Sequence, residues 1–298
     1  MKGSAEIVKR ALDAGTAVPG FNIPYLPMMA PVVDALRDTQ CFGFIMVARL
    51  EWTKFEAGSV EAIQAEYARV KDERYTRLHL DHVPVIDEDH LRVDYEGDIA
   101  RALAVGYDSV MVDASRLPLE ENILASRRIV EMAHARKVPV EAELGAVMGH
   151  EAGPLPPYDE LFASGAGFTR PDEAARFVRE TGVDWLSIAI GSVHGAISAA
   201  RSEKKIAARL DIAHLKRLRE ATGVPLVLHG GTGIPRHYIL DSIRNGIAKI
   251  NVATAIRQPY EAARAASPEA AFRAVYDATV AVIEQDLDLG GTARWLLS

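Results

Sequence analysis

Apolar runs alternate with amphipathic stretches along the whole chain. Short, mostly apolar runs are typical of buried parallel strands, and they predict strands at residues 18–23, 42–47, 76–80, 109–112, 138–143, 185–190, 225–228 and 248–252. Amphipathic stretches between them predict helices at residues 28–39, 95–105, 123–136, 171–181, 212–222 and 235–245. Glycine, which is common just after helices, follows four of them, at Gly106, Gly182, Gly223 and Gly246.

Regular strand–helix alternation predicts the fold class. Eight such units without a break in composition predict an α/β protein with one (β/α)8 TIM-barrel domain over residues 1–298. The alternative, an open doubly wound sheet, is disfavoured because no glycine-rich dinucleotide-binding turn follows the first strand. A closing helix is expected over residues 268–287.

One connection, residues 145–169, is too long for a minimal barrel and is rich in Gly, Pro and Ala. Long loops after barrel strands are commonly lids, so we expect a mobile lid here. The alternative is a surface excursion without a role. Because the connection 145–169 directly follows the strand that ends at Glu143, a lid is favoured over such an excursion.

Composition narrows the choice of partners and compartment. The chain has 298 residues, 49% of them hydrophobic, which is enough for one barrel-sized core. The net charge of −7 and the lack of a basic run argue against a nucleic-acid partner. The single cysteine, Cys41, excludes an internal disulfide and favours a reducing compartment. No signal peptide or membrane-spanning run is visible, so we expect a cytoplasmic protein without a membrane partner.

Three histidines lie at or just past the ends of predicted strands, each beside a glycine or an acid: His82, His194 and His229. Parallel-strand folds place catalytic groups at the carboxyl ends of their strands. One such histidine alone is more often structural, but three in similar contexts favour a catalytic metal site with a position left for substrate. His79 faces the opposite side of its strand from Leu80, toward the expected interior, and no role is assigned to it.

Acids and glycine-rich turns share the same rim. Asp81 precedes His82, Asp113 ends the fourth strand and Glu143 ends the fifth. Asp113 and Glu143 either orient ligand histidines or cap helices, or they act directly.

Residues 230–233 and 251–254 follow the seventh and eighth strands, where barrels commonly bind phosphate. A metal, an acid and a phosphate site together favour chemistry at a carbon next to a carbonyl.

These segments resemble the class II, metal-dependent ketose-bisphosphate aldolases, the group of fructose- and tagatose-bisphosphate aldolases. The likeness runs from residues 19–22 to 290–291 and is most specific at residues 79–82, 110–115, 117–122, 141–145, 194–195, 228–233 and 251–254.

The resemblance implies a role for individual residues. It implies that His82, His194 and His229 bind one Zn²⁺ and that Glu143 can approach the metal; Asp113, from its place at a strand end, is a further candidate ligand. It implies that Asp81 exchanges a proton with the aldehyde-derived oxygen. Glu151, on the long connection, matches the base that takes a proton from dihydroxyacetone phosphate. The residues implied to contact substrate are Asn22, Gly195, Gly230, Gly231, Thr232, Asn251, Ala253 and Thr254.

The implied activity is a zinc-dependent aldolase. It would reversibly cleave a ketose phosphate, either a bisphosphate or another anionic ketose 1-phosphate, to dihydroxyacetone phosphate and an aldehyde. We expect a homodimer or homotetramer acting on a small phosphorylated sugar. The alternatives are a metal-dependent phosphosugar epimerase or isomerase, and a non-catalytic sugar-phosphate-binding subunit.

The chain departs from the family where the far end of the substrate is bound. Relatives usually carry a Ser-x-Gly segment after the second strand, whereas this chain has Arg49-Leu50-Glu51. We expect Arg49 to contact a phosphate, carboxylate or other anion there, because guanidinium binds such groups with paired hydrogen bonds. The alternative is an ion pair between Arg49 and Glu51. Residues 196–209 also differ from the usual Tyr-rich, Lys-containing loop.

Overall fold

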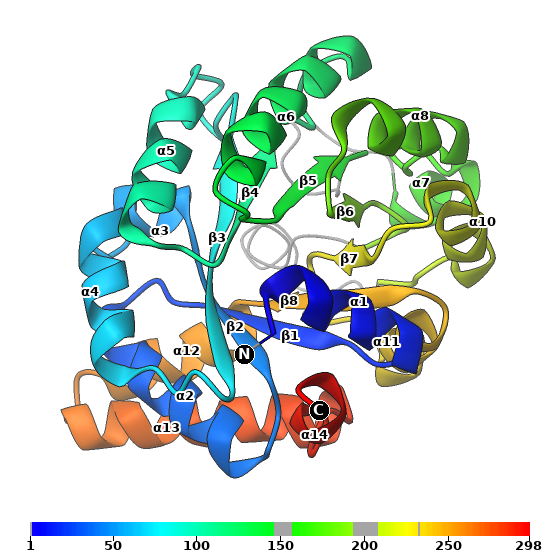
Figure 1. Ribbon diagram of the computed structural model, residues 1–298. Coiled ribbons are helices and arrows are strands. Elements are labelled where there is room, and N and C mark those ends of the chain that lie inside the picture. Colours follow the sequence, from blue (N-terminus) through cyan, green and yellow to red (C-terminus); the bar gives the residue numbers. More distant parts are fainter. Residues whose placement is uncertain (1, 146–156, 193–207, 232) are drawn as a thin grey trace.

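The computed structural model describes residues 2–145, 157–192, 208–231 and 233–298. Within these residues, eight parallel strands close into one barrel in chain order, with β8 paired to β1 (Figure 1). The strands are β1 (Val18–Asn22), β2 (Gly43–Ala48), β3 (Thr76–Pro84), β4 (Ser109–Asp113), β5 (Val140–Leu144), β6 (Trp185–Ile188), β7 (Leu226–Leu228) and β8 (Ile247–Val252). The predicted (β/α)8 TIM-barrel fold is confirmed.

Helices cover the outside of the barrel (Figure 1). They are α2 (Met29–Asp38), α3 (Arg49–Thr53), α4 (Val60–Val70), α5 (Tyr95–Val105), α6 (Leu119–His134), α7 (Tyr158–Ser164), α8 (Pro171–Thr181), α10 (Ile212–Thr222), α11 (Arg236–Arg244), α12 (Thr254–Ala263) and α13 (Pro268–Ala281), with short turns η1 (Leu26–Met28) and η2 (Val282–Asp286). The expected closing helix is therefore α13 followed by the π-helical turn η2. Among the helices of the described residues, none has the length and apolar character to cross a membrane.

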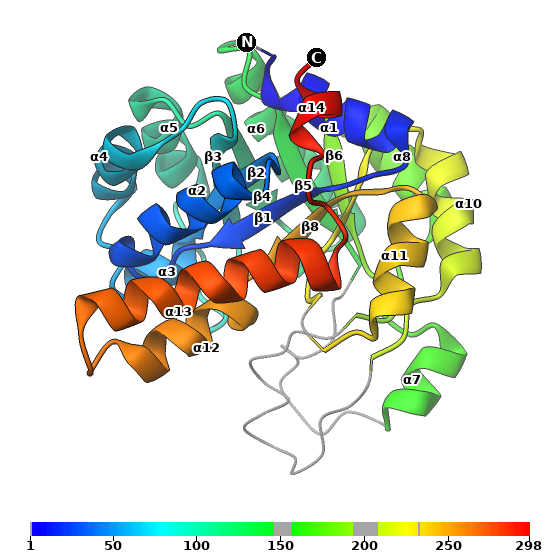
Figure 2. The same cartoon turned by 90° about the horizontal axis from the view of Figure 1, so that it is seen from below.

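The amino end of the barrel is closed by helix α1 (Ser4–Ala14) and the short helix α14 (Ala293–Leu296). Ile7, Val8 and Ala11 lie on one face of α1, and they join an apolar cluster with Phe42 and Phe44 inside the barrel. Figure 2 shows α1, α14 and both chain termini at one end of the molecule and α7 at the opposite end. This arrangement leaves chemistry to the carboxyl ends of the strands.

Strand β3 is longer than predicted. It continues to Pro84, whereas the sequence pattern ends it at Leu80, because the register between β3 and β4 shifts between Leu80 and Val83. His82 has a φ of 25°, a backbone conformation that non-glycine residues rarely adopt. In a regular strand Asp81 and His82 would face opposite sides. The irregularity re-aims one of them, as bulges do near active sites, so that both side chains join one cluster.

Candidate active site

Two of the three predicted metal ligands meet across the barrel. His82 comes from β3 and His229 directly follows β7, on the opposite wall, yet their ring centroids are 4.6 Å apart. Glu143 of β5 places Oε2 3.2 Å from His229 Nδ1. His194 lies outside the described residues, so its role as the third ligand stays a prediction.

A carboxylate lies against one nitrogen of each of the two imidazoles. His229 Nε2 lies 2.8 Å from Glu141 Oε1, while its Nδ1 is buried and has no hydrogen-bond partner among the described residues. His82 Nδ1 lies 3.0 Å from Asp113 Oδ2, so this carboxylate holds one nitrogen of the His82 ring. Carboxylates that hold the second nitrogen of metal-binding histidines are typical of zinc sites. His229 Nδ1, buried 3.2 Å from Glu143 Oε2 and without a hydrogen bond to any described residue, therefore fits a divalent metal ion.

Asp81 is held by two amides. Asn22 Nδ2 and Asn251 Nδ2 donate to its two oxygens, each over 2.9 Å. Burial alone would raise the pKa of Asp81, but the positive charges of His82 and Lys249 outweigh it and lower that pKa well below its usual range. Asp81 is therefore a fixed carboxylate, and the two amides implied to contact substrate contact this acid.

Other charges around the two histidines favour a cation. Burial alone would lower the pKa of His82, but Asp81 and Asp113 outweigh it and raise that pKa to about 10. Burial likewise opposes the shift at Asp113, whose pKa is lowered by its hydrogen bond with His82. Asp113 also accepts bonds from the backbone and hydroxyl of Ser115, so it orients His82 and fixes the turn after β4. The surplus of carboxylates stabilises positive charge at this place.

The sequence interpretation missed a buried network below the cluster. Lys249 of β8 places Nζ 2.9 Å from Glu141 Oε2 and 2.6 Å from Asn251 Oδ1. Burial would raise the pKa of Glu141, but Lys249 and His229 lower it to about 2. The signal was present, because a lysine inside the apolar run 247–252 falls on the same strand face as Asn251.

His79 lies inside the barrel, as its strand position predicts. It is fully buried, and its Nδ1 lies 2.8 Å from Ser109 Oγ. Burial and the nearby Lys249 lower the pKa of His79 to about 3. It is therefore a neutral residue beside the network.

The two segments predicted to bind phosphate, residues 230–233 and 251–254, follow neighbouring strands, because β7 pairs with β8. Gly230 has a φ of 69°, which only glycine adopts without strain, and α12 begins at Thr254 directly after Ala253. The first backbone N–H groups of a helix this long can bind an anion. Gly231 belongs to the same turn, whereas Gly195 and Thr232 lie outside the described residues.

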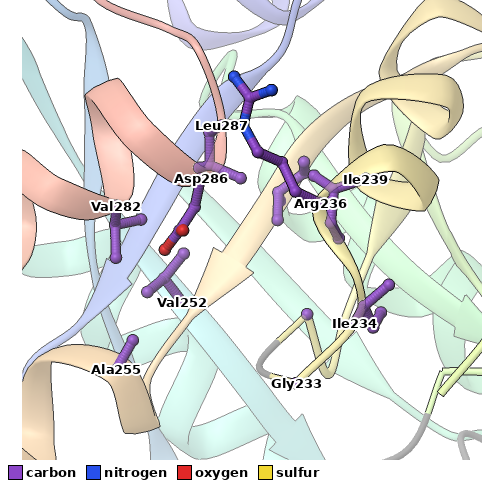
Figure 3. Close-up of a pocket in the computed structure, with 11 residues that line it drawn as sticks. Gly233, Ile234, Arg236, Ile239, Val252, Ala255, Val282, Asp286 and Leu287 are labelled. Carbon is purple, nitrogen blue, oxygen red and sulfur yellow. The ribbon is translucent and has the colours of Figure 1, made fainter. Parts of the chain in front are cut away.

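A cavity of about 200 Å³ lies beside this turn (Figure 3). It is lined by Gly231, Gly233, Ile234, Arg236, Ile239, Ile250, Val252, Ala255, Val282, Asp286 and Leu287. Arg236 extends toward Leu287 and away from Gly233, and its Nε donates to the carbonyl of Gln285. Gly231 lines the cavity, but Asp81, His82, Glu143 and His229 do not.

Arg49 is the first residue of α3, beside the carboxyl end of β2. The alternative that it pairs with Glu51 is wrong. Its Nε lies 3.2 Å from Asp98 Oδ2 and its Nη1 3.8 Å from Asp87 Oδ2. Glu51 is buried instead and accepts the backbone N–H of Ala48 over 2.7 Å, so its carboxylate is used to start α3.

The connection 145–169 contains helix α7. Tyr158 of α7 contacts the carbonyl of Gly191 over 3.0 Å, which ties the helix to the segment after β6. Glu151 lies outside the described residues. Its role as the base therefore stays a prediction, as does the lid.

Known proteins are similar to this chain in sequence and in architecture. The sequence model of the family described as fructose-bisphosphate aldolase class-II matches residues 2–293. A "probable fructose-bisphosphate aldolase" of Bacillus subtilis (strain 168) is 35% identical over 254 residues, which cover 84% of this chain and 80% of that protein. A fructose-bisphosphate aldolase of Geobacillus stearothermophilus is 34% identical over 252 residues, covering 84% and 79%.

Solved structures agree with the sequence comparisons. The crystal structure of the YdjI aldolase from Escherichia coli K12 superposes with a TM-score of 0.75 and 26% identity, covering 98% of this chain and 99% of that one. The chain therefore belongs to the class-II fructose-bisphosphate aldolase family, and it is an aldolase, a carbon–carbon lyase.

Proposed function

We propose that the protein is a zinc-dependent aldolase that reversibly cleaves a ketose phosphate to dihydroxyacetone phosphate and an aldehyde. The substrate is a ketose bisphosphate or another anionic ketose 1-phosphate. One observation carries the proposal: His229 Nδ1, which has no hydrogen-bond partner among the described residues, is buried beside His82 and Glu143 at the carboxyl end of the barrel. Membership in an aldolase family argues against the alternative of a non-catalytic sugar-phosphate-binding subunit.

The metal would be held by His82 Nε2, His229 Nδ1 and His194, with Glu143 and Asp113 beside it. A divalent ion supplies a Lewis acid for the ketose carbonyl oxygen. Glu141 contacts Nε2 of His229 and Asp113 contacts Nδ1 of His82, so these two carboxylates would hold both rings in orientation for the metal.

Proton transfer is assigned to two acids. In the cleavage direction, Asp81 accepts the hydroxyl proton of the carbon that becomes the aldehyde, and the adjacent carbon–carbon bond breaks. The electron pair moves toward the carbonyl of the dihydroxyacetone phosphate half, and Glu151 returns a proton to its carbon. The fixed, ionised state of Asp81 between Asn22 and Asn251 supports its role as the acceptor.

Two groups of residues would bind the two ends of the substrate. Gly195, the turn of Gly230, Gly231 and Thr232, and residues 251–254 would hold the phosphate of dihydroxyacetone phosphate. Support comes from the positive φ of Gly230 and the amino end of α12 at neighbouring strands. We propose that Arg49 contacts the anionic group at the end of the substrate far from the metal. Arg49 would then leave Asp98, its partner in the absence of substrate, and pair with that anionic group.

We propose that residues 1–298 form one domain and that segment 145–169 closes over bound substrate. Limited proteolysis with and without dihydroxyacetone phosphate tests both. Ligand should protect segment 145–169, and cleavage into two stable halves would contradict the single domain.

We also propose a cytoplasmic homodimer or homotetramer. The free thiol of Cys41, buried in the core, suits a reducing compartment. Light scattering of the purified protein measures the assembly, and a monomer would contradict it. Fractionation of the producing cells tests the compartment.

A substrate screen tests the activity itself. Phosphorylated ketoses, including acidic ones, are offered to the zinc-loaded enzyme, and release of dihydroxyacetone phosphate is measured. Chelation should abolish release and added Zn²⁺ should restore it. Conversion of a ketose to an isomer without triose phosphate would replace the proposal with the epimerase or isomerase alternative.

A further inference from the structure

The ammonium of Lys249 is buried inside the barrel, below the metal site. Its side chain is fully buried, and a buried ammonium is tolerated only where polar partners replace water. Its partners are Glu141 Oε2 at 2.9 Å and Asn251 Oδ1 at 2.6 Å. The proposed function assigns no role to Lys249.

The contact with Glu141 leads to His229. Glu141 faces Lys249 with Oε2 and His229 Nε2 with Oε1, the latter over 2.8 Å. Because the ammonium balances its charge, Glu141 stays a carboxylate and accepts the proton of Nε2. That proton assignment leaves the lone pair of Nδ1, which has no hydrogen-bond partner among the described residues, for the metal.

The contact with Asn251 leads to Asp81. An ammonium can only donate, so Asn251 must turn its oxygen toward Lys249. Its Nδ2 then faces Asp81 Oδ1 and donates over 2.9 Å. Lys249 thus determines the orientation of the Asn251 amide, and that amide holds Asp81 in place.

We propose that Lys249 is a positioning residue that orients His229 through Glu141 and Asp81 through Asn251. The inference rests on the proposed function, since it concerns that function's metal ligand and acid. It gives one residue control of two features that the reaction needs together: metal affinity and the placement of the proton acceptor.

A second metal ion is the competing explanation for this network. His79, Asp81 and Glu141 have ligand atoms close enough to share an ion. The ammonium of Lys249 already supplies positive charge to Glu141 at 2.9 Å. Two zinc ions per chain in the wild type would therefore overturn the proposal.

The test compares two buried cations of the barrel. Lys249→Met removes the ammonium and keeps an unbranched side chain. Arg77→Met is the matched control, because Arg77 is also buried on a barrel strand but donates to the carbonyls of Lys2 and Thr76 near the amino end. Zinc affinity is measured by competition with a chromogenic chelator, and kcat, KM and the Tm of the zinc-free protein are measured alongside.

Lys249→Met should weaken zinc binding about 10–100-fold, as loss of a supporting contact to a ligand typically does. It should lower kcat more than KM, because Asp81 loses its alignment. Arg77→Met should lower Tm while zinc affinity and kcat stay near wild type. Equal losses of zinc affinity and kcat in both variants would show a general effect on folding and overturn the proposal.

The double variant Lys249→Met/Glu141→Gln separates the two contacts and also serves if the single variant does not fold. It buries no unpaired charge, and the amide oxygen that replaces the Glu141 carboxylate can still accept from His229 Nε2. Zinc affinity should recover toward wild type while kcat stays low, because Asn251 is still unanchored. Wild-type kcat in the double variant would overturn the proposal.

The zinc content of the wild type distinguishes an error about Lys249 from an error about the metal site. If the wild type binds one zinc and Lys249→Met binds it as tightly with unchanged kcat, only the role of Lys249 is wrong. If the wild type binds no zinc, the proposed function fails too.

Discussion

The two ends of the barrel are built from the same strands but hold opposite kinds of side chain. At the amino end, Phe42 and Phe44 pack in an apolar cluster under α1. At the carboxyl end, His82, Glu143 and His229 place nitrogen and oxygen atoms within contact distance. Residues at the amino ends of the strands therefore serve stability, and residues at the carboxyl ends serve chemistry. Substitutions at one end should therefore leave the function of the other intact.

The largest effect is expected from Asp81→Asn at the carboxyl end. It removes the proton acceptor and sets an NH₂ group against one of the two amide donors. We expect kcat to fall about 10²–10⁴-fold, the usual contribution of a general acid or base, while zinc content stays at the wild-type level. Steady-state kinetics and metal analysis measure this.

The matched control is the same substitution at the other end. Asp108 precedes β4 and accepts the backbone N–H of Leu78 over 2.8 Å. Asp108→Asn should leave kcat close to wild type. A similar loss of kcat in both variants would break the proposed separation of the two ends.

The next effect is expected at the amino end. Phe42 is fully buried, so Phe42→Ala removes a large apolar contact surface. The free energy of unfolding should fall by about 3–5 kcal/mol, from lost transfer free energy and the cavity left behind. Denaturant unfolding of the zinc-free protein measures it. The folded fraction should bind zinc as tightly as wild type, and weaker zinc binding would show that the two ends are coupled.

A smaller effect is expected at the edge of the carboxyl end. Arg49→Ala should raise KM for the whole ketose by the equivalent of about 1.5–3 kcal/mol, the worth of a hydrogen bond to a charged group. Binding of dihydroxyacetone phosphate alone should hardly change. Arg101→Ala is the control, because Arg101 also pairs with Asp98 but lies farther along α5. Equal weakening of both ligands by Arg49→Ala would assign Arg49 to the fold or the metal site.

The smallest effect is a pH dependence confined to the carboxyl end. The neighbouring acids raise the pKa of His82 to about 10, so zinc must displace a proton from it at neutral pH. Zinc affinity should therefore rise with pH, about tenfold per unit for one displaced proton, and fall as the solution becomes acidic. Calorimetry in buffers of different ionisation enthalpy counts the protons. Phe42→Ala should keep the same slope, and a flat profile in wild type would contradict the charge balance proposed for the site.

The sequence predicted the fold well because barrel strands and helices are coded by local periodicity. It predicted the end of β3 wrongly, at Leu80 rather than Pro84. The strand continues past Leu80 through a shift in its register against β4. The alternation of apolar and polar residues within β3 carries no information about that register. The same shift explains why alternation alone could not bring Asp81 and His82 to one cluster.

Residue types and a family resemblance led to His82 and His229, and the contact of Asp113 with His82 was among the alternatives considered, but the contacts of Lys249 and Arg49 were not predicted. Lys249 was overlooked, although a lysine within an apolar strand was a visible signal. The alternative partner considered for Arg49 was Glu51, two residues away, whereas the structure pairs it with Asp98 of α5. Contacts between distant elements require the barrel to be built first.

The central claim is that the histidines at the carboxyl end bind one catalytic zinc ion. Metal analysis by mass spectrometry of wild type, His82→Ala, His229→Ala and His134→Ala tests it most directly. His134 is the control, since it lies on α6 outside the barrel and contacts Asp184. We predict about one zinc per chain in wild type and His134→Ala, and its loss in the other two variants, because a catalytic zinc site needs about three protein ligands. Full zinc content in both His82→Ala and His229→Ala would contradict the account.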